Sequence, residues 1–331
     1  MRALVTGGGG FLGGGIAQSL CEKNHDVKVL GRRHYSHLPK AIKLCQGDIR
    51  DFDFLRKEFA GVEVVFHTAA FPGIWGRAED FYSINVDGTR NVIKACLLNG
   101  VQKLVFTSSP SVIYGDSSLE GVDETAPYPE NYLCEYSRTK ALAEKLVTEA
   151  NSAYLATVSI RPHLIWGPGD PHLVPRILAK ADKGRLLRVG PGENKVDIIY
   201  IDNAVSAHLK ACDALGVGKP PAGKVYFISD GEPVNLWNWI NELLKKTGRP
   251  PVTRSISYRI ALKLGHLLER AYNFLGIKQE PPMTRFLASQ LATSHYFNIS
   301  QAKNDFGYEP VVSPEEGMNR LIQSLLVPQE C

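Results

Sequence analysis

The feature that most constrains this sequence is a run of glycines directly after its first apolar segment. The chain begins MRALVTGGGGFLGGG, so a strand-like stretch leads through the glycines into a segment of helical character. In a strand–turn–helix unit, Gly7 permits the tight turn, Gly10 lets a pyrophosphate approach the backbone, and Gly13 allows close helix packing. The start of the helix, at Phe11 and Leu12, offers free N–H groups to phosphate. This pattern predicts a dinucleotide-binding loop rather than a purely structural turn.

The glycine run opens a regular alternation of apolar runs and helical periods. Such an alternation is typical of a parallel sheet covered by helices on both faces. We therefore predict an α/β fold of the Rossmann type, with a doubly wound parallel sheet. The expected strands cover residues 2–7, 26–31, 63–70, 103–109, 155–162 and 224–229, and the expected helices cover residues 11–23, 51–60, 85–99, 136–151 and 236–247.

The alternation becomes irregular after Gly167, where glycines and prolines cluster. We expect residues 1–165 to form the dinucleotide-binding domain, with its sheet completed by segments near 195–230. Residues 166–331 then form mainly a smaller substrate-binding region. Apolar residues recur at helical spacing over 258–276, which favours a helix covering a core or pocket over a helix lying on a membrane surface.

The composition argues against several other classes of protein. The 38 basic and 34 acidic residues give a net charge of +4, too small to indicate nucleic-acid binding. The six cysteines are scattered singly, so we expect neither a metal site nor a disulfide scaffold, and reduced thiols fit a cytoplasmic protein. We also expect neither a signal peptide nor a segment long enough to span a bilayer.

The end of the second expected strand indicates which dinucleotide binds. NAD sites commonly carry an acidic residue there, which binds the ribose 2′-hydroxyl. This chain has Gly31 near that place, followed by Arg32 and Arg33. Guanidinium groups pair well with a 2′-phosphate, so the sequence favours NADP(H). The alternative is that both arginines are solvated loop charges.

Two further strand ends suit other parts of the cofactor. Asp48 fits a hydrogen bond from the adenine amino group, with Ile49 against the ring. Asp48 equally suits the N-cap of the following helix, and both interpretations stay open. Ala69 and Ala70 are small enough to let the cofactor pass close. We expect the neighbouring His67 to be packed in the core and not catalytic.

A tyrosine and a lysine four residues apart carry the expected chemistry. Tyr136 and Lys140 lie on one face of a predicted helix. A phenol normally ionises near pH ~10, and a nearby ammonium together with an oxidised nicotinamide favours the phenolate. Tyr136 is therefore predicted to exchange a proton with a substrate oxygen while nicotinamide carries the hydride, and Lys140 also to bind the nicotinamide ribose.

Several hydroxyl groups follow the fourth expected strand, in the segment FTSSPSVIYG. One of them would hold the substrate oxygen beside the tyrosine. Ser108, Ser109 and Ser111 compete for that role, and serines at strand ends are more often turn or cap residues. The residues alone leave this choice open.

These motifs together resemble the extended short-chain dehydrogenase/reductase family over essentially the whole chain, and within it the 3β-hydroxysteroid dehydrogenase/isomerase branch. The matching segments are TGGGGFLG, YSRTK, SIRPHLIWGPGD, TSSPSVIYG, YIDNAVSAHLKA and VYFISDGEPV. The resemblance implies that Arg161, Pro162 and His163 lie beside the nicotinamide, and it includes Thr107 among the cofactor contacts. Many extended members have a hydroxyl residue where this chain has Pro110, so the resemblance to the steroid and flavonoid branches assigns the catalytic serine to Ser109, with Ser111 in reserve.

Other blocks resemble a bacterial branch that acts on 2-alkyl-3-oxoalkanoates in long-chain olefin biosynthesis. They are GIWG, PPVTRSISYR, MTRFLASQLATSHYF and DFGYEPVVSPEEG. The resemblance implies NADPH-dependent reduction of a bulky, apolar β-keto acid to the β-hydroxy acid. Residues 256–275 offer apolar material for a cleft or lid, and Arg176, Arg254 and Arg285 are candidates for pairing with the substrate carboxylate.

Three other functions remain as alternatives. They are a 3β-hydroxysteroid or sterol-4-carboxylate dehydrogenase, a nucleotide-sugar epimerase, and a non-enzymatic NADP sensor. Arg32 and Arg33 argue against the epimerase, and the presence of Tyr136 and Lys140 argues against the sensor. Peripheral membrane contact, and a homodimer formed by the helices at 85–99 and 136–151, also stay open.

Overall fold

A seven-stranded parallel sheet forms the centre of the computed structural model, which describes residues 1–115 and 117–326. The strand order is β12-β7-β5-β4-β1-β2-β3, so the order reverses between β1 and β4. This arrangement confirms the predicted doubly wound α/β fold. The strands are β1 (Arg2–Thr6), β2 (Asp26–Gly31), β3 (Lys43–Gln46), β4 (Val64–His67), β5 (Lys103–Thr107), β7 (Ala156–Pro162) and β12 (Lys224–Ile228).

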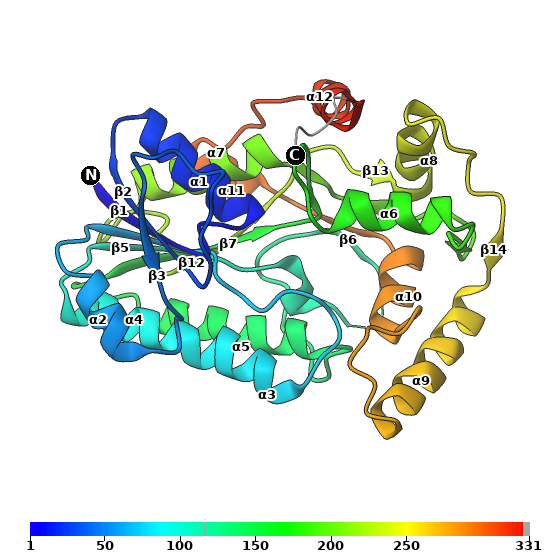
Figure 1. Ribbon diagram of the computed structural model, residues 1–331, viewed down its shortest axis with the longest axis horizontal. Helices are drawn as coiled ribbons and strands as arrows, with labels where there is room; N and C mark the ends of the chain where they lie inside the picture. Colours follow the sequence, from blue (N-terminus) through cyan, green and yellow to red (C-terminus); the bar gives the residue numbers. More distant parts are fainter. Residues whose placement is uncertain (116, 327–331) are drawn as a thin grey trace.

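Helices cover both faces of this sheet (Figure 1). One face carries α2 (Phe52–Glu58), α4 (Gly88–Leu98) and α5 (Glu135–Glu149), and the other carries α1 (Phe11–Glu22), α7 (Ile201–Ala214) and α11 (Ser300–Phe306). The side chains of β1 explain this layering. Ala3 and Val5 belong to one buried cluster and Leu4 to the other, because successive side chains of a strand point to opposite faces. A strand buried on both faces has to be apolar throughout.

Most predicted elements are found with bounds that differ by one or two residues, and the larger differences occur at three places. β3 was not among the predicted strands, because it is a four-residue edge strand with only two apolar side chains. β4 ends at His67, before the two alanines. The helix expected from residue 85 begins earlier, with α3 (Ala78–Phe81) and a π-helical turn over Tyr82–Asp87 that leads into α4.

Short strands and helices after β7 build a second region at the carboxyl ends of the sheet strands. A four-stranded sheet in the order β13-β10-β15-β6 joins segments far apart in the chain. Its strands are β6 (Leu119–Val122), β10 (Lys195–Val196), β13 (Val234–Asn235) and β15 (His295–Phe297). The remaining elements are β8 (Ile165–Trp166), α6 (Leu173–Asp182), β9 (Arg188–Val189), β11 (Ile199–Tyr200), α8 (Leu236–Lys246), β14 (Ser255–Ile256), α9 (Tyr258–Phe274), α10 (Arg285–Ala292) and α12 (Pro314–Leu326).

The periodicity of α9 predicted a helix that covers a core or pocket, and the structure bears this out only in part: Tyr258 and Leu262 pack against the core. Its buried residues are Ala261, Gly265 and Glu269, whereas Leu267 and Phe274 are exposed. The amphipathic pattern is therefore present with its apolar stripe facing outward. Among the described residues, no helix has both the length and the apolarity needed to cross a bilayer.

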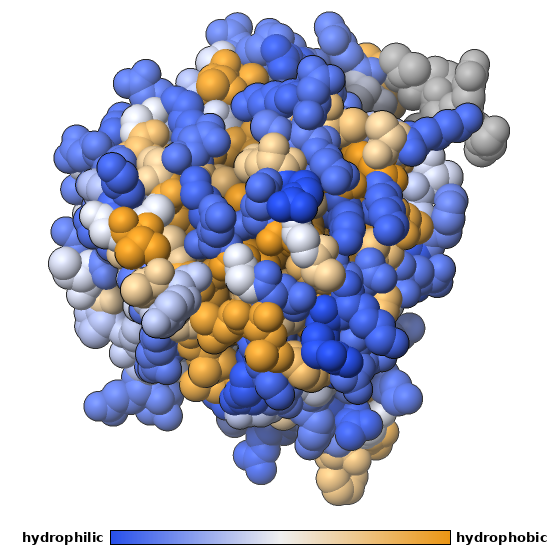
Figure 2. Space-filling view, turned by 90° about the vertical axis from the view of Figure 1, so that its left-hand side faces the viewer, coloured by the Kyte–Doolittle hydropathy of each residue, from blue (hydrophilic) through white to orange (hydrophobic). Residues whose placement is uncertain are grey.

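The opposite end of the molecule, where the strands begin, is mostly hydrophilic with an apolar patch near its centre (Figure 2). Exposed apolar side chains occur in the segments that lead into the strands there. They include Met1 before β1, Leu98 before β5 and Tyr154 before β7. These residues lie away from the carboxyl ends of the strands, where ligands bind in open α/β sheets.

Candidate active site

The predicted site residues gather at the carboxyl ends of six neighbouring strands. The residues after β1, β2, β3, β4, β5 and β7 all open onto this edge, because parallel strands end on the same side. The crevice between β1 and β4, where the strand order reverses, is the expected binding position. The predicted cofactor residues there are Gly7, Gly10, Phe11, Leu12, Gly13, Arg32, Arg33, Asp48, Ile49, Ala69, Ala70, Thr107, Pro162 and His163.

The glycine loop has room for backbone but not for side chains. Gly7 has φ +69°, and a Cβ atom there would lie 2.7 Å from the backbone nitrogen of Ala69. A Cβ at Gly13 would lie 2.4 Å from the Gly7 carbonyl oxygen. Gly10 is the N-cap of α1, so the first N–H groups of the helix remain open to an anion. These contacts fit the predicted pyrophosphate cradle.

Tyr35 accounts for two glycines that the motif does not require. A Cβ at Gly9 would lie 2.2 Å from the Tyr35 ring, and one at Gly31 would lie 2.4 Å from its hydroxyl. Tyr35 thus closes the space between the phosphate loop and the end of β2. Arg32 and Arg33 follow Gly31 with exposed side chains. Any side chain at position 31, an acid included, would require Tyr35 to move.

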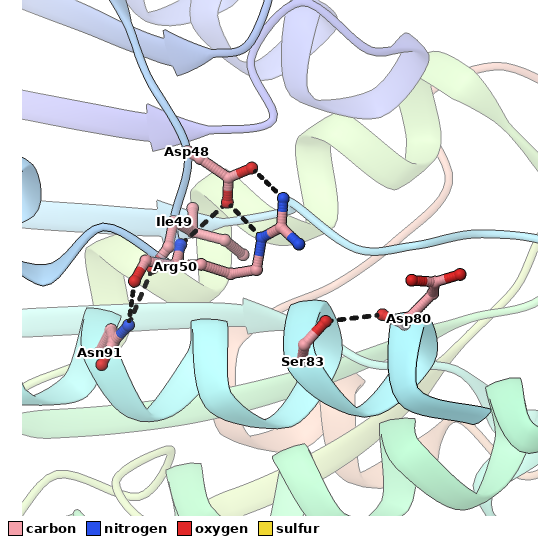
Figure 3. A network of polar contacts seen from close by, with 6 residues as sticks. All are labelled: Asp48, Ile49, Arg50, Asp80, Ser83 and Asn91. Atoms are coloured by element: carbon pink, nitrogen blue, oxygen red, sulfur yellow. Dashed lines mark hydrogen bonds and ion pairs between the residues drawn. The ribbon is translucent and has the colours of Figure 1, made fainter. Parts of the chain in front are cut away.

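A polar network fixes the loop after β3 (Figure 3). Asp48 accepts three hydrogen bonds from Arg50. The donors are the Arg50 backbone nitrogen (2.9 Å), Nε (3.0 Å) and Nη2 (2.7 Å). These bonds hold the pKa of Asp48 below its usual value. Asn91 of α4 donates to the carbonyls of Ile49 and Arg50. The N-cap of α2 is Asp51, which excludes the alternative that Asp48 caps this helix.

The π-helical turn positions Asn85 to hold the loop after β4. The Asn85 side chain is buried, accepts from the Phe71 backbone N–H at 2.7 Å and donates to Thr139 Oγ1 of α5 at 3.0 Å. It therefore connects a loop of the crevice to the helix that carries Tyr136. A π-helical turn within a helix is frequent at functional sites.

His67 is fully buried between two hydroxyl groups. Thr89 Oγ1 donates to the Asn85 carbonyl, so it accepts from His67 Nε2 at 2.9 Å, and Thr6 Oγ1 donates to Nδ1 at 2.7 Å. Burial lowers the pKa of His67 to about 3. With both ring nitrogens engaged, the imidazole is neutral and structural.

Tyr136 lies in the first turn of α5, close enough to Ser109 for that hydroxyl to act on the pKa of the phenol. Burial raises the pKa of Tyr136 to about 12, and the contact with Ser109 opposes that rise. Ser109 Oγ also lies 3.0 Å from Ser111 Oγ and accepts from the Ser111 backbone nitrogen at 3.2 Å. Ser111 is buried behind Ser109, while Ser108 Oγ is buried without a partner among the described residues. Of the three serines, Ser109 is the one whose hydroxyl acts on the pKa of the phenol.

Lys140 lies one turn further along α5, fully inside the protein. Its Nζ donates to the Thr107 carbonyl at 2.6 Å and lies 4.0 Å from the centroid of the Phe106 ring. The Thr107 hydroxyl in turn donates to His208 Nε2 at 2.9 Å, because His208 Nδ1 donates to the Ala204 carbonyl. Burial lowers the pKa of Lys140 to about 7. The backbone at the end of β5 therefore holds the Lys140 amine one helical turn from Tyr136.

The low pKa of Lys140 makes stability depend on pH. In the unfolded chain a lysine holds its proton to about pH 10, whereas in the folded, cofactor-free protein Lys140 loses it near pH 7. The unfolded state then binds more protons over this window, so the free energy of unfolding rises with pH. Relative to Lys140→Met, we expect the wild type to gain about 1 kcal/mol per pH unit between about pH 7 and 10.

Urea denaturation at several pH values measures this difference. Lys145→Met, at an exposed position of the same helix, serves as the control and keeps the wild-type slope. Parallel curves for wild type and Lys140→Met would contradict the assignment.

The predicted nicotinamide neighbour His163 directs its ring into a buried chain of polar contacts. His295 Nε2 donates to the Gln290 carbonyl at 3.0 Å, so its Nδ1 accepts from His163 Nε2 at 2.7 Å. His163 Nδ1 then accepts from the Tyr114 hydroxyl at 3.3 Å. Burial lowers the pKa of both histidines, that of His295 to about 4. This neutral chain ties β7 to β15 and leaves the His163 backbone at the crevice.

Arg161 also directs its side chain away from the crevice. Its guanidinium donates to Glu144 of α5 through Nε at 2.9 Å and Nη2 at 2.6 Å, and both side chains are buried. Tyr128 adds a third hydrogen bond to this carboxylate at 2.6 Å. In the structure, the Arg161 side chain joins β7 to α5.

Two of the three arginines considered for a substrate carboxylate already have acidic partners. Arg176 pairs with Glu280, and Arg285 pairs with Glu269 at 2.7 Å. Arg254 is exposed in the segment before β14. The structure does not bring the three guanidinium groups together as a single carboxylate site.

Sequence reasoning missed Tyr35, His295 and Leu164 near the crevice. Leu164 has φ +45°, and Asn24 is the only other non-glycine residue with positive φ among those described. A left-handed leucine is strained, and such residues cluster at functional sites. The surplus glycines at positions 9 and 31 were a usable signal for a bulky neighbour, whereas nothing local marks Leu164.

Comparison with known sequences yields one family and several close relatives. A sequence model of the 3-beta hydroxysteroid dehydrogenase/isomerase family matches residues 4–258. A protein named 2-alkyl-3-oxoalkanoate reductase, from Stenotrophomonas maltophilia (strain K279a), is 47% identical over 324 residues, covering 97% of this chain and 98% of that protein. The Mus musculus protein named sterol-4-alpha-carboxylate 3-dehydrogenase, decarboxylating, is 33% identical over 328 residues, covering 98% and 90%.

Solved structures share the fold at lower sequence identity. The structure titled MoeE5 in complex with UDP-glucose and NAD superposes with a TM-score of 0.76 and 23% identity, covering 98% of both chains. At this identity the likeness concerns the fold, including the sheet edge at which the predicted site lies.

Proposed function

The chain belongs to the 3-beta hydroxysteroid dehydrogenase/isomerase family, and from this premise we propose that it is an NADP(H)-dependent reductase of 2-alkyl-3-oxo acids. Its product is the corresponding 3-hydroxy acid. The observation that carries the proposal is the placement of Tyr136 and the buried Lys140 one turn apart on α5, with the Lys140 amine bound to the carboxyl end of β5 and Ser109 just beyond that strand. This set of groups suits proton transfer to a carbonyl oxygen.

The substrate class is supported by two relatives of 45% identity or more. Two bacterial proteins named 2-alkyl-3-oxoalkanoate reductase are 47% and 45% identical to this chain. They match nearly its full length, so the similarity includes residues 166–326, which we propose to bind mainly substrate. Residues 1–165 with β12 would bind the cofactor. The sterol-4-carboxylate dehydrogenases, which are less similar, remain the second candidate because their named substrates also carry a carboxylate on an apolar body.

In the proposed mechanism the side chains hold and protonate the ketone oxygen. Ser109 donates a hydrogen bond to this oxygen, and Tyr136 transfers its phenolic proton to it. When bound, NADPH supplies the hydride that the carbonyl carbon gains. Lys140 would hold the nicotinamide ribose of the bound cofactor, and its ammonium form would lower the pKa of Tyr136 from its raised value. The phenolate then recovers a proton from solvent.

The 2′-phosphate of NADPH would lie between the end of β2 and the phosphate loop. Gly31 stands where an NAD site commonly has an acid, and Tyr35 leaves no room for a side chain there. Arg32 lies close enough to Asp48 for its charge to lower the pKa of that carboxyl group. Arg32 and Arg33, both exposed at this edge, would pair with the phosphate.

Replacing both arginines tests the choice of cofactor. For Arg32→Ala/Arg33→Ala we expect the Kd for NADPH to rise about tenfold or more, since charge-assisted hydrogen bonds to a phosphate are lost. The Kd for NADH changes less than about twofold, because NADH lacks this phosphate. Titration of nicotinamide fluorescence gives both values. Arg56→Ala/Lys57→Ala, an exposed pair on α2, controls for net charge, and equal losses for both cofactors would count against the assignment.

A substrate panel tests the proposed activity itself. Purified protein is mixed with NADPH and a 2-alkyl-3-oxo acid, a 3-ketosteroid, or a UDP-sugar, and NADPH oxidation is followed at 340 nm. We expect the highest kcat/KM with the 2-alkyl-3-oxo acid. A preference for the steroid would support the second candidate. Bound NAD that copurifies with the protein, together with conversion of the UDP-sugar, would replace the proposal with an epimerase.

A further inference from the structure

The outward face of α9 carries large apolar side chains that the rest of the described chain leaves uncovered. Ile260, Leu267, Phe274 and Leu275 are 58%, 64%, 91% and 66% exposed. Ile260, Leu264, Leu267 and Phe274 follow one another at spacings of four, three and seven residues, so they lie on one face of the helix, and Leu275, its C-cap, adjoins Phe274. We call these five residues the α9 stripe. A contiguous exposed patch of this kind marks an interaction surface.

The opposite face of α9 is fastened to α10, so the α9 stripe is held in a fixed orientation. A Cβ at Gly265 would lie 2.6 Å from the Thr284 carbonyl carbon, which shows how closely the two helices approach. Glu269 accepts from the backbone nitrogen and from Nε of Arg285, both at 2.7 Å. Figure 1 shows α9 at the edge of the molecule, with α10 between it and the body.

The exposed charged side chains of α9 and of the segments directly before and after it are cations, as far as Glu280, which pairs with Arg176. Five exposed cations lie within residues 251–279, all of which the structure describes. The only acid in this range is Glu269, which is buried and paired. The cations are Arg254, Arg259, Lys263, Arg270 and Lys278. An apolar stripe bordered by cations is the pattern of a helix that lies on an anionic membrane surface.

The C-terminal end of α9 reaches the loops around the candidate active site. Trp75, in the loop after β4, donates from Nε1 to the Ile277 carbonyl at 3.3 Å and packs edge-on against Tyr272 at 6.3 Å. On the neighbouring α10, Phe286 stacks on Tyr114 at 6.4 Å. A surface that binds the α9 stripe would therefore adjoin the substrate side of the crevice.

We propose that the α9 stripe docks the protein on the surface of anionic phospholipid bilayers and presents the crevice to substrate dissolved there. The need for such a location rests on the proposed function, because a bulky, apolar 2-alkyl-3-oxo acid partitions into lipid. A second copy of the chain fits this face poorly, since pairing two α9 stripes would bring the five cations of each copy together. An anionic bilayer would bury the apolar side chains and attract the cations to its headgroups.

Vesicle co-sedimentation of the full chain tests the docking. We expect binding to vesicles of phosphatidylglycerol and phosphatidylcholine, weaker binding to phosphatidylcholine alone, and release from the anionic vesicles at high salt. Leu267→Glu/Phe274→Glu should lower the bound fraction about tenfold or more, because both side chains lose their apolar contact. Leu98→Glu/Tyr154→Glu adds the same charge at exposed positions on the opposite end and should keep at least half of the binding.

Equal binding of the two variants, or no binding of the wild type to anionic vesicles, would overturn the proposal. A wild-type dimer that Leu267→Glu/Phe274→Glu dissociates in analytical ultracentrifugation would also overturn it, since a second copy would then cover the stripe. Reduction of a short-chain, water-soluble 2-alkyl-3-oxo acid without vesicles should be equal in wild type and both variants. That assay separates the two claims, because the activity can persist when docking fails.

Discussion

Tyr136→Phe should lower kcat by about 100-fold or more, a loss of at least about 2.7 kcal/mol of transition-state stabilisation. The substitution removes one oxygen atom and leaves the ring to pack in the first turn of α5. Without the phenolic proton the developing alkoxide must take its proton from water. Ser109 still donates a hydrogen bond to the ketone oxygen, so KM should change far less than kcat. Steady-state NADPH oxidation with a 2-alkyl-3-oxo acid gives both constants.

Binding of NADPH provides the necessary comparison. The variant should bind NADPH within about twofold of wild type, because the glycine loop and Lys140 are intact. Tyr154→Phe removes an exposed phenol, 84% accessible, and should keep wild-type turnover. Wild-type turnover in Tyr136→Phe would remove the proton-donor role of this residue and with it the proposed mechanism.

Glu144→Gln should destabilise the folded protein by about 3–5 kcal/mol. The carboxylate is buried and accepts two hydrogen bonds from Arg161 and one from Tyr128. The amide is nearly the same size, so little packing is lost. The guanidinium of Arg161, however, keeps its charge in the core without a counter-ion. Chemical denaturation measures the loss, and Tm should fall by on the order of 5–10 °C.

Two further variants separate the charge from other causes. Glu149→Gln, at an exposed position five residues later on α5, should stay within about 0.5 kcal/mol of wild type. Glu144→Leu/Arg161→Met removes both charges and should recover a large part of the lost stability, because an apolar pair avoids the cost of burying ions. If the double variant is as unstable as Glu144→Gln, the unpaired charge is not the cause.

The fold was predictable because its signals are local and repeated. Each central strand of the sheet is a short apolar run, and Ala3, Leu4 and Val5 show why such a run has no polar face. The glycine motif then fixed the position of the turn between β1 and α1. β3 escaped prediction because only two of its four residues are apolar and it lies at the sheet edge.

The site was predictable where a motif keeps its residues close in sequence. Tyr136 and Lys140 share one helix face, and Ser109 follows the adjacent strand. Contacts between distant segments gave no such signal. Tyr35 over Gly9 and Gly31, and Asn85 between Phe71 and Thr139, depend on how loops fold back on the sheet.

Side-chain direction was the least predictable property. The periodicity of α9 showed an apolar stripe but not which way it faces, because small residues such as Ala261 and Gly265 made the buried contact instead. Arg161 is similar, since its place at the end of β7 suggested the cofactor, whereas its side chain pairs with a glutamate on α5. Which side of an element is buried depends on its neighbours.

Isotope transfer shows whether the protein moves a hydride from NADPH to the ketone carbon. The protein is incubated with a 2-alkyl-3-oxo acid and NADPH that carries deuterium at the transferable C4 position, and the 3-hydroxy acid is analysed by mass spectrometry. We expect one deuterium, bound to C3 of the product, with one hydroxyl proton derived from solvent through Tyr136. A product without deuterium at C3, or no 3-hydroxy acid formed from any 2-alkyl-3-oxo acid, would contradict the proposed function.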